Sequence, residues 1–229
     1  MSAGGWDPGR IREWVDTQDW YQTIPVADGI VTPGTVDSRQ RLERLGLPAD
    51  LSGRSVLDVG CNSGMYCFEC ASRGADPVIG IDVNETRLQQ ARTLAEIMGS
   101  PVRFESMDLL AARDLGRFDI VLCFAVVTEI PDLLGALEAL ADLTAGTLFL
   151  EVGLLEGKRG RFRFPLPRLG ALVTRALFAQ PVAQLRRTKR GWSLVPERRV
   201  LDAVLGDRFA IHDLGPSVRY RLFRLDRRP

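Results

Sequence analysis

Short apolar runs alternate with longer amphipathic segments along most of this chain. Runs typical of buried strands occupy residues 55–59, 78–82, 101–105, 118–124 and 147–152. Apolar positions at helical spacing fill the gaps, most clearly over residues 84–99 and 132–143. Strands that alternate with helices in this way predict an α/β fold with a parallel sheet.

Two further strand-like segments, residues 209–214 and 219–225, follow one another without a helix between them. Neighbouring strands joined by a short turn pair antiparallel. We therefore expect a Rossmann-like fold whose mostly parallel, seven-stranded sheet ends in an antiparallel edge hairpin.

The hydropathy pattern divides the chain into four parts: a helical and extended cap (1–54), the alternating core (55–156), an insertion (157–196) and the end of the sheet (197–229). The cap has a helical pattern around residues 11–20. A second amphipathic helix in the cap is expected near Leu42, Leu45 and Leu47, where Pro48 then ends the pattern.

The insertion carries ten Lys and Arg residues and no Asp or Glu, around a helix-like apolar stretch, "LGALVTRALFAQPVAQL". Such a segment can be a solvated basic face, a lid over an acceptor, or a contact for RNA or a membrane. Its apolar stretch also suits a homodimer contact. The apolar stretch suits a cover over a pocket better than a track along a phosphate backbone, which favours the lid over RNA binding.

The chain as a whole has little net charge. Its 229 residues include 30 Lys plus Arg and 29 Asp plus Glu, so no global field attracts nucleic acid or a membrane surface. The N-terminus lacks the pattern of a signal peptide, and no apolar run approaches the roughly 20 residues of a membrane span. These features predict a cytoplasmic protein.

The cysteines are Cys61, Cys67, Cys70 and Cys123. Three of them cluster without histidine partners, so we expect no zinc or other metal site. Their positions on an apolar helix face and in a strand predict reduced, structural thiols.

A glycine turn follows the first core strand, in "DVGCNSG" at residues 58–64, and the second core strand ends on Asp82. A dinucleotide fingerprint reads G-x-G-x-x-G, and that spacing is absent here. Asn62 stands at the middle position of the turn. Asn tolerates left-handed backbone better than other residues with a side chain, so the turn is expected to form.

This segment resembles the D/E-x-G-x-G-x-G motif of class I S-adenosylmethionine (SAM)-dependent methyltransferases, and the resemblance extends over residues 56–152. It implies that Asp82 accepts the ribose hydroxyls and that Asp108 accepts from the adenine amino group. The cofactor-binding residues that it implies are Asp58, Gly60, Asn62, Ser63, Gly64, Asp82, Val83, Met107, Asp108 and Phe124.

The segments "WYQTIPVADGIVTPGTVD" and "GMYCFECASRGA" resemble a narrower subgroup, related to the tRNA wobble-uridine carboxymethyltransferases. That subgroup commonly has Tyr-His after the fourth strand, where this chain has Thr128 and Glu129. It also has a longer N-terminal region. The expected acceptor is therefore a small molecule, and nucleic acid is not the expected partner.

Transfer of a methyl group to a hydroxyl needs a base, so the carboxylates and the one histidine become candidates. Glu129 follows the fourth strand and Glu151 ends the fifth, while His212 lies in a late strand. Each has a structural alternative, as a capping, buried or surface group. Expected substrate contacts are Trp20, Tyr21 and Thr128, although the two aromatic residues could instead pin the N-terminal segment to the sheet.

These observations predict a SAM-dependent methyltransferase that acts on a small molecule, with O-methylation favoured over N-methylation. Two alternatives stay open. One is a tRNA wobble-uridine modification enzyme, and the other is a non-catalytic SAM-binding domain that serves a partner.

Overall fold

The structure is a computed structural model that describes residues 5–27, 29–36, 39–155, 183–188, 191–217 and 220–229. Its main sheet has seven strands in the order β10-β11-β7-β6-β3-β4-β5. Five strands are parallel, and their bounds are β3 (Val56–Val59), β4 (Val78–Asp82), β5 (Arg103–Ser106), β6 (Phe118–Phe124) and β7 (Thr144–Val152). The predicted α/β fold is confirmed.

The antiparallel edge is confirmed as well. Strand β11 (Arg221–Arg227) pairs antiparallel with β7 on one side and with β10 (Phe209–Pro216) on the other. The chain order reverses between β3 and β6, because β4 and β5 extend the sheet in one direction and β6 and β7 in the other. Ligands of open α/β sheets bind at such a switch point, beyond the carboxyl ends of the strands.

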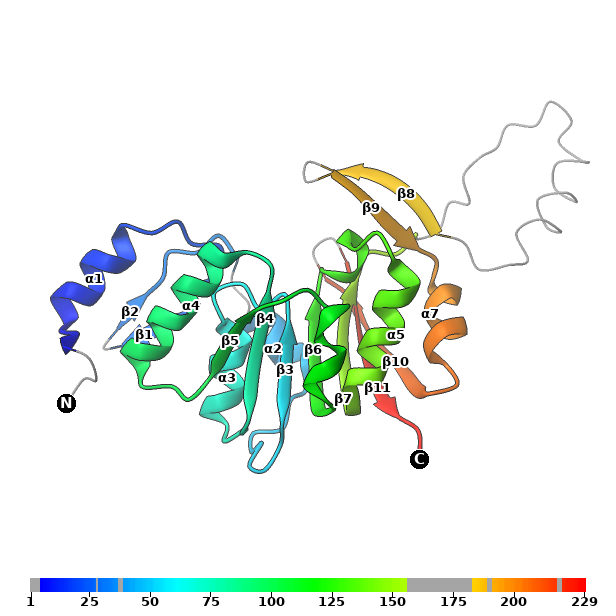
Figure 1. The fold of residues 1–229 in the computed structure, drawn as a ribbon, viewed down its shortest axis with the longest axis horizontal. Helices are drawn as coiled ribbons and strands as arrows, with labels where there is room; N and C mark the ends of the chain where they lie inside the picture. The colour runs from blue at the N-terminus through cyan, green and yellow to red at the C-terminus, as the bar shows by residue number, and fades with distance from the viewer. Residues whose placement is uncertain (1–4, 28, 37–38, 156–182, 189–190, 218–219) are drawn as a thin grey trace, which may run out of the picture.

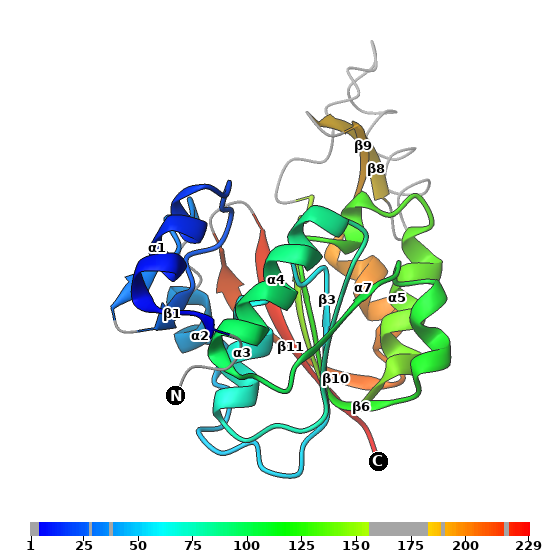
Figure 2. The ribbon, with the colours of Figure 1, turned by 60° about the vertical axis from the view of Figure 1, so that its left-hand side comes forward.

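Helices cover both faces of this sheet (Figure 2). One apolar layer is formed with α3 (Met65–Ser72) and α4 (Glu85–Met98), and it includes Leu88 and Leu94 at 0% exposure. The opposite layer is formed with α5 (Leu133–Leu143) and α7 (Arg198–Leu205). Short 3-10 helices, η2 (Ala111–Leu115) and η3 (Val127–Glu129), follow β5 and β6.

The N-terminal part packs on the α3 and α4 side of the molecule (Figures 1 and 2). It contains α1 (Pro8–Asp16), a small antiparallel pair of β1 (Pro25–Ala27) and β2 (Ile30–Val31), and α2 (Arg39–Leu45). Helix α1 ends earlier than the sequence pattern predicts, at Asp16. Leu42, Leu45 and Leu47 are buried, as the amphipathic pattern predicts.

The basic insertion is only partly described. Residues 156–182, with most of its apolar stretch, lie outside the described residues. The remainder forms an antiparallel hairpin of β8 (Ala183–Thr188) and β9 (Gly191–Pro196), where the sequence pattern predicts no strands. The prediction of a helix is therefore wrong from Ala183 onward. Strands β8 and β9 form by pairing with each other, and the periodicity of a single segment does not reveal a strand partner elsewhere in the chain.

All four cysteines are free and buried, at positions where the sequence predicts structural thiols. Burial raises the pKa of both Cys70 and Cys123 to about 12, which keeps these thiols protonated. Among the described residues, no helix is long and apolar enough to cross a membrane.

Candidate active site

The glycine turn connects β3 to α3 at the switch point of the sheet. Gly60 and Gly64 have φ angles of +73° and +90°, and Asn62 has a φ of 55°, so the predicted left-handed Asn is confirmed. A Cβ on Gly60 would lie 2.3 Å from Val126 Cγ2, in the segment after β6. Glycine is thus required by both the conformation and the close approach of two loops.

Asp82 lies at the carboxyl end of β4, beside this turn. Its Oδ2 accepts a hydrogen bond from the Asn62 backbone N–H at 2.9 Å, and its Oδ1 accepts from the Asn84 N–H at 2.8 Å. An ionised carboxylate offers about four acceptor positions. These two bonds orient Asp82 and leave acceptor capacity for a pair of hydroxyl groups.

Asp58, at the start of the turn motif, is buried and only 1% exposed. The Cys67 thiol on α3 donates to Asp58 Oδ2 at 3.5 Å. Burial raises the pKa of Asp58 to about 7, and the nearby Asp82 charge adds to the rise against the Cys67 hydrogen bond and Arg41. Asp58 therefore supports the turn from inside the core.

The predicted adenine-side residues lie at the ends of β4 and β5. Val83 is 73% exposed, and the Met107 N–H donates to the Asp82 carbonyl at 3.1 Å. Asp108 is also exposed, and its Oδ1 accepts from the Ala111 N–H at 2.9 Å, at the start of η2. The structure therefore brings these three residues together with Asp82 along one edge of the sheet.

The end of β6 forms the other side of the switch point. Phe124 is partly buried, and its ring centroid lies 4.7 Å from that of Tyr66 on α3. Ala125 has a φ of 60°, which is uncommon for a residue with a Cβ and is often found at functional sites. The sequence contains no signal for this conformation.

Arg41 of α2 reaches the same end of the sheet. Its guanidinium donates to Tyr66 Oη and to Glu151 Oε1, and it lies 5.3 Å from the Phe124 ring centroid. Sequence reasoning missed Arg41 and Tyr66. Tyr66 falls within the quoted "GMYCFE" motif, whereas nothing in the pattern distinguishes Arg41 from a surface residue of an amphipathic helix.

The three base candidates are not brought together. Glu129 is exposed in η3, directly after β6, and Thr128 beside it is buried. Glu151 is fully buried and paired with Arg41. His212 lies on β10, which β11 and β7 separate from β6, and its Nε2 is 3.4 Å from Asp226 Oδ2.

The two predicted substrate aromatics differ in exposure. Trp20 is buried, with its Nε1 donating to the Val15 carbonyl at 2.7 Å and its ring packed edge-on against Trp14. Tyr21 is 41% exposed. The next residue, Gln22, is buried and accepts from the Met65 N–H at 3.3 Å, so the N-terminal segment contacts the first turn of α3.

A comparison with known protein families matches residues 56–145 to the family described as "Methyltransferase domain". The matched stretch contains the glycine turn, Asp82 and the end of β6. Residues 56–145 are a class I SAM-dependent methyltransferase domain. The cofactor of such a domain is SAM.

Curated relatives of the methyltransferase domain belong to more than one group. The chain is 32% identical over 119 residues to a tRNA U34 carboxymethyltransferase of Campylobacter hominis, covering 51% of this chain and 42% of that one. It is 30% identical over 134 residues to a ubiquinone biosynthesis O-methyltransferase of Coxiella burnetii, covering 58% and 55%. The chain thus spans about half the length of these curated relatives.

Solved structures share the fold of this chain. The N-terminal domain of EvdMO1 with SAH bound has a TM-score of 0.70 at 16% identity, over 97% of this chain and 98% of that one. Magnesium protoporphyrin IX methyltransferase from Synechocystis PCC 6803 with bound SAM has a TM-score of 0.57 at 20% identity, over 83% and 77%.

The residues of the methyltransferase site fit SAM in chemical terms. Asp82 keeps acceptor capacity of the kind that two ribose hydroxyls require. Exposed Val83 and partly buried Met107 offer apolar surface beside Asp82. The side chains of Asp58 and Ser63 are buried and face other protein groups.

Proposed function

We propose that this protein transfers a methyl group from SAM to a hydroxyl group of a small-molecule acceptor. The observation that carries the proposal is the position of Glu129, an exposed residue of η3, the element that follows β6. The other two candidates are placed less favourably, since Glu151 is buried against Arg41 and His212 lies at the sheet edge. The match to ubiquinone biosynthesis O-methyltransferases also supports a hydroxyl acceptor.

In this proposal the chain has three tasks. Asp82 holds the ribose of SAM, and the turn from Gly60 to Gly64 lets the backbone approach it. Glu129 accepts the proton of the acceptor hydroxyl, a step typically worth about 100- to 10,000-fold in rate. When bound, SAM supplies an electrophilic methyl group for in-line displacement.

The hairpin of the basic insertion borders this proposed site. Strand β9 lies against η3, the element that carries Glu129, and the Leu155 N–H donates to the Pro196 carbonyl at 2.9 Å. This position supports a covering role for β8 and β9, the described part of the 157–196 insertion, which would exclude water as methyl transfer requires. A homodimer contact through the same residues stays a prediction.

An acceptor screen tests the O-methylation proposal. Wild-type protein with SAM is offered phenols and catechols beside matched anilines, and release of S-adenosylhomocysteine is measured. We expect turnover with hydroxyl compounds that Glu129→Gln reduces. Turnover with the amines alone would reject hydroxyl transfer.

A tRNA acceptor is the second candidate, and the match to the tRNA U34 carboxymethyltransferase favours it. If the basic insertion binds tRNA phosphates, affinity should fall with log salt, at a slope near −0.7 per phosphate for single strands. Reversal of Arg186, Arg187 and Arg190 to Glu should then abolish binding. We instead expect weak, nonspecific tRNA binding in both the wild type and the reversal variant.

We also propose that the protein works in the cytoplasm. The four free cysteines support this, because thiols persist in reducing compartments. Fractionation of cells that produce the protein tests it, and recovery from an oxidising compartment would contradict it.

A further inference from the structure

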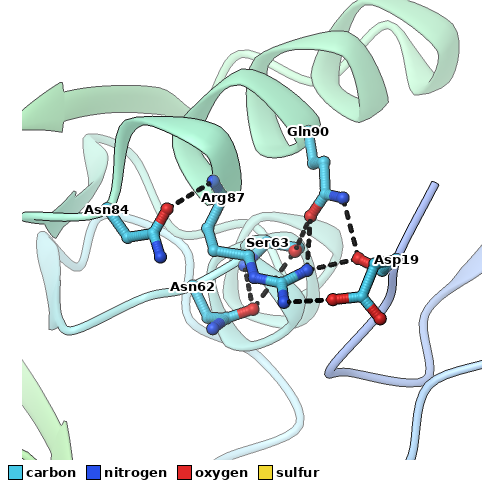
Figure 3. A network of polar contacts seen from close by, with 6 residues as sticks. All are labelled: Asp19, Asn62, Ser63, Asn84, Arg87 and Gln90. Atoms are coloured by element: carbon cyan, nitrogen blue, oxygen red, sulfur yellow. Dashed lines mark hydrogen bonds and ion pairs between the residues drawn. The ribbon is translucent and has the colours of Figure 1, made fainter. Parts of the chain in front are cut away.

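A buried glutamine connects the cofactor turn with the N-terminal segment (Figure 3). Gln90 lies on α4 and is only 3% exposed. Its Oε1 accepts a hydrogen bond from Ser63 Oγ at 2.9 Å, and its Nε2 donates to the Asp19 carbonyl at 2.9 Å. The oxygen of the Gln90 amide thus binds the cofactor turn, and the nitrogen binds the N-terminal segment.

Arg87, one turn earlier on α4, reinforces the contact with Asp19. Its Nη2 lies 2.8 Å from Asp19 Oδ2, and its Nη1 donates to the Asp19 carbonyl and to Gln90 Oε1. The Arg87 side chain is 18% exposed and that of Asp19 is 91% exposed. The backbone carbonyl of Asp19 therefore accepts from two side chains of α4, Arg87 and Gln90.

Ser63 passes the connection on to the turn itself. The Ser63 N–H donates to Asn62 Oδ1 at 2.9 Å, and the Asn62 N–H donates to Asp82 Oδ2 at 2.9 Å. A continuous hydrogen-bonded chain therefore runs from Asp19 through Gln90, Ser63 and Asn62 to Asp82. A glycine at position 62 could not take part through a side chain.

We infer that Gln90 is a positioning residue for the cofactor site. Through Ser63 it holds Asn62, and therefore Asp82, in the orientation that accepts the ribose hydroxyls. Through Asp19 it keeps the N-terminal segment beside the same turn. The inference rests on SAM binding at this turn and is independent of the acceptor, so an incorrect O-methylation proposal leaves it intact.

Two substitutions separate the hydrogen bond from Ser63 to Gln90 from the hydrogen bond that Gln90 donates to Asp19. Gln90→Leu removes both hydrogen bonds and should weaken SAM binding by about tenfold, as expected when buried polar groups lose a partner. In its ionised form, which the adjacent Arg87 favours, Gln90→Glu keeps an acceptor for Ser63 and Arg87 but cannot donate to the Asp19 carbonyl. SAM affinity of Gln90→Glu should therefore stay near the wild-type value. Gln89→Leu, at the exposed neighbouring position on α4, is the matched control and should bind SAM normally.

Isothermal titration measures SAM affinity, and hydrogen exchange with and without SAM measures protection of residues 19–36. We expect SAM to protect these residues in the wild type and in Gln89→Leu, but not in Gln90→Glu, which still binds SAM. A residue that only stabilises α4 would not separate SAM affinity from the SAM-dependent protection of residues 19–36. If Gln90→Leu does not fold, Ser63→Ala tests the turn arm alone and should also weaken SAM binding.

Three outcomes would overturn the inference. The first is unchanged SAM affinity in Gln90→Leu or Ser63→Ala, and the second is equal loss of affinity in the Leu and Glu variants. The third is SAM-dependent protection of residues 19–36 that persists in Gln90→Glu. If the unaltered protein does not bind SAM, the cofactor assignment fails together with this inference, which distinguishes that result from the other three.

Discussion

Arg41 and Glu151, 110 residues apart in the chain, form an ion pair whose carboxylate is completely buried. Arg41 Nε donates to Oε1 at 3.1 Å, and Nη2 lies 3.0 Å from Oε2. Among the described residues, no donor completes a hydrogen bond to Oε2. The pair joins the N-terminal α2 to the end of β7. The Glu151 carboxylate, a base candidate in the sequence, is therefore paired with Arg41.

Loss of Arg41 should therefore destabilise the protein severely. Arg41→Met leaves a buried carboxylate without its cation, which typically costs about 3–5 kcal/mol. Urea unfolding measures the change. The double variant Arg41→Met with Glu151→Leu should recover much of the loss, because it removes the unpaired charge. Equal instability of the single and double variants would contradict this account.

Asp82→Ala should weaken SAM binding without unfolding the protein. Each hydrogen bond from a hydroxyl to a charged carboxylate contributes about 1.5–3 kcal/mol, so the loss should exceed tenfold. Calorimetric titration with SAM measures it, and Asp114→Ala, an exposed carboxylate in η2, is the control. Unchanged affinity in a folded Asp82 variant would remove Asp82 from the site.

Glu129→Gln tests the proposed base. Turnover of a hydroxyl acceptor should fall by roughly 100-fold or more while SAM affinity is preserved, since only proton transfer is lost. Glu138→Gln, an exposed substitution of the same type on α5, should leave turnover unchanged. Near-normal turnover by the Glu129 variant would point to an amine acceptor or another base.

Asp58 should make the protein less stable as the pH rises. Its folded pKa of about 7 lies above the unfolded value of about 3.9, so between them the folded state holds a proton that the unfolded chain releases. Stability should fall by up to about 1.4 kcal/mol per pH unit over this range and level off above pH 7. Asp58→Asn lacks this contribution.

Urea unfolding from pH 5 to 8 measures the difference between the wild type and Asp58→Asn. The wild type should lose stability relative to the variant as the pH rises. Asp119 provides a contrast, because hydrogen bonds from Ser55 lower its pKa. The stabilisation from Asp119 is present above its unfolded pKa and is lost on acidification through its folded pKa. Parallel pH curves for the wild type and Asp58→Asn would contradict the assignment.

Local sequence was sufficient for the sheet and for the glycine turn at its switch point. The apolar runs predict the five parallel strands, and two adjacent runs without a helix predict the antiparallel edge. The turn at residues 58–64 and the terminal Asp82 place a ligand site at the switch point. These features depend on short-range pattern and turn chemistry, which a single sequence displays directly.

Only the tertiary structure decided which polar groups face the site and which are hydrogen-bonded to other side chains inside the protein. Asp58 and Ser63 belong to the turn motif, yet the structure turns Asp58 toward Cys67 and Ser63 toward Gln90. Glu151 lies at the end of a strand as expected, but its carboxylate is paired with Arg41. Each partner comes from another element, and periodicity reports that a position is buried without identifying what it is buried against. For the same reason, the pairing of β8 with β9 emerged only from the assembled fold.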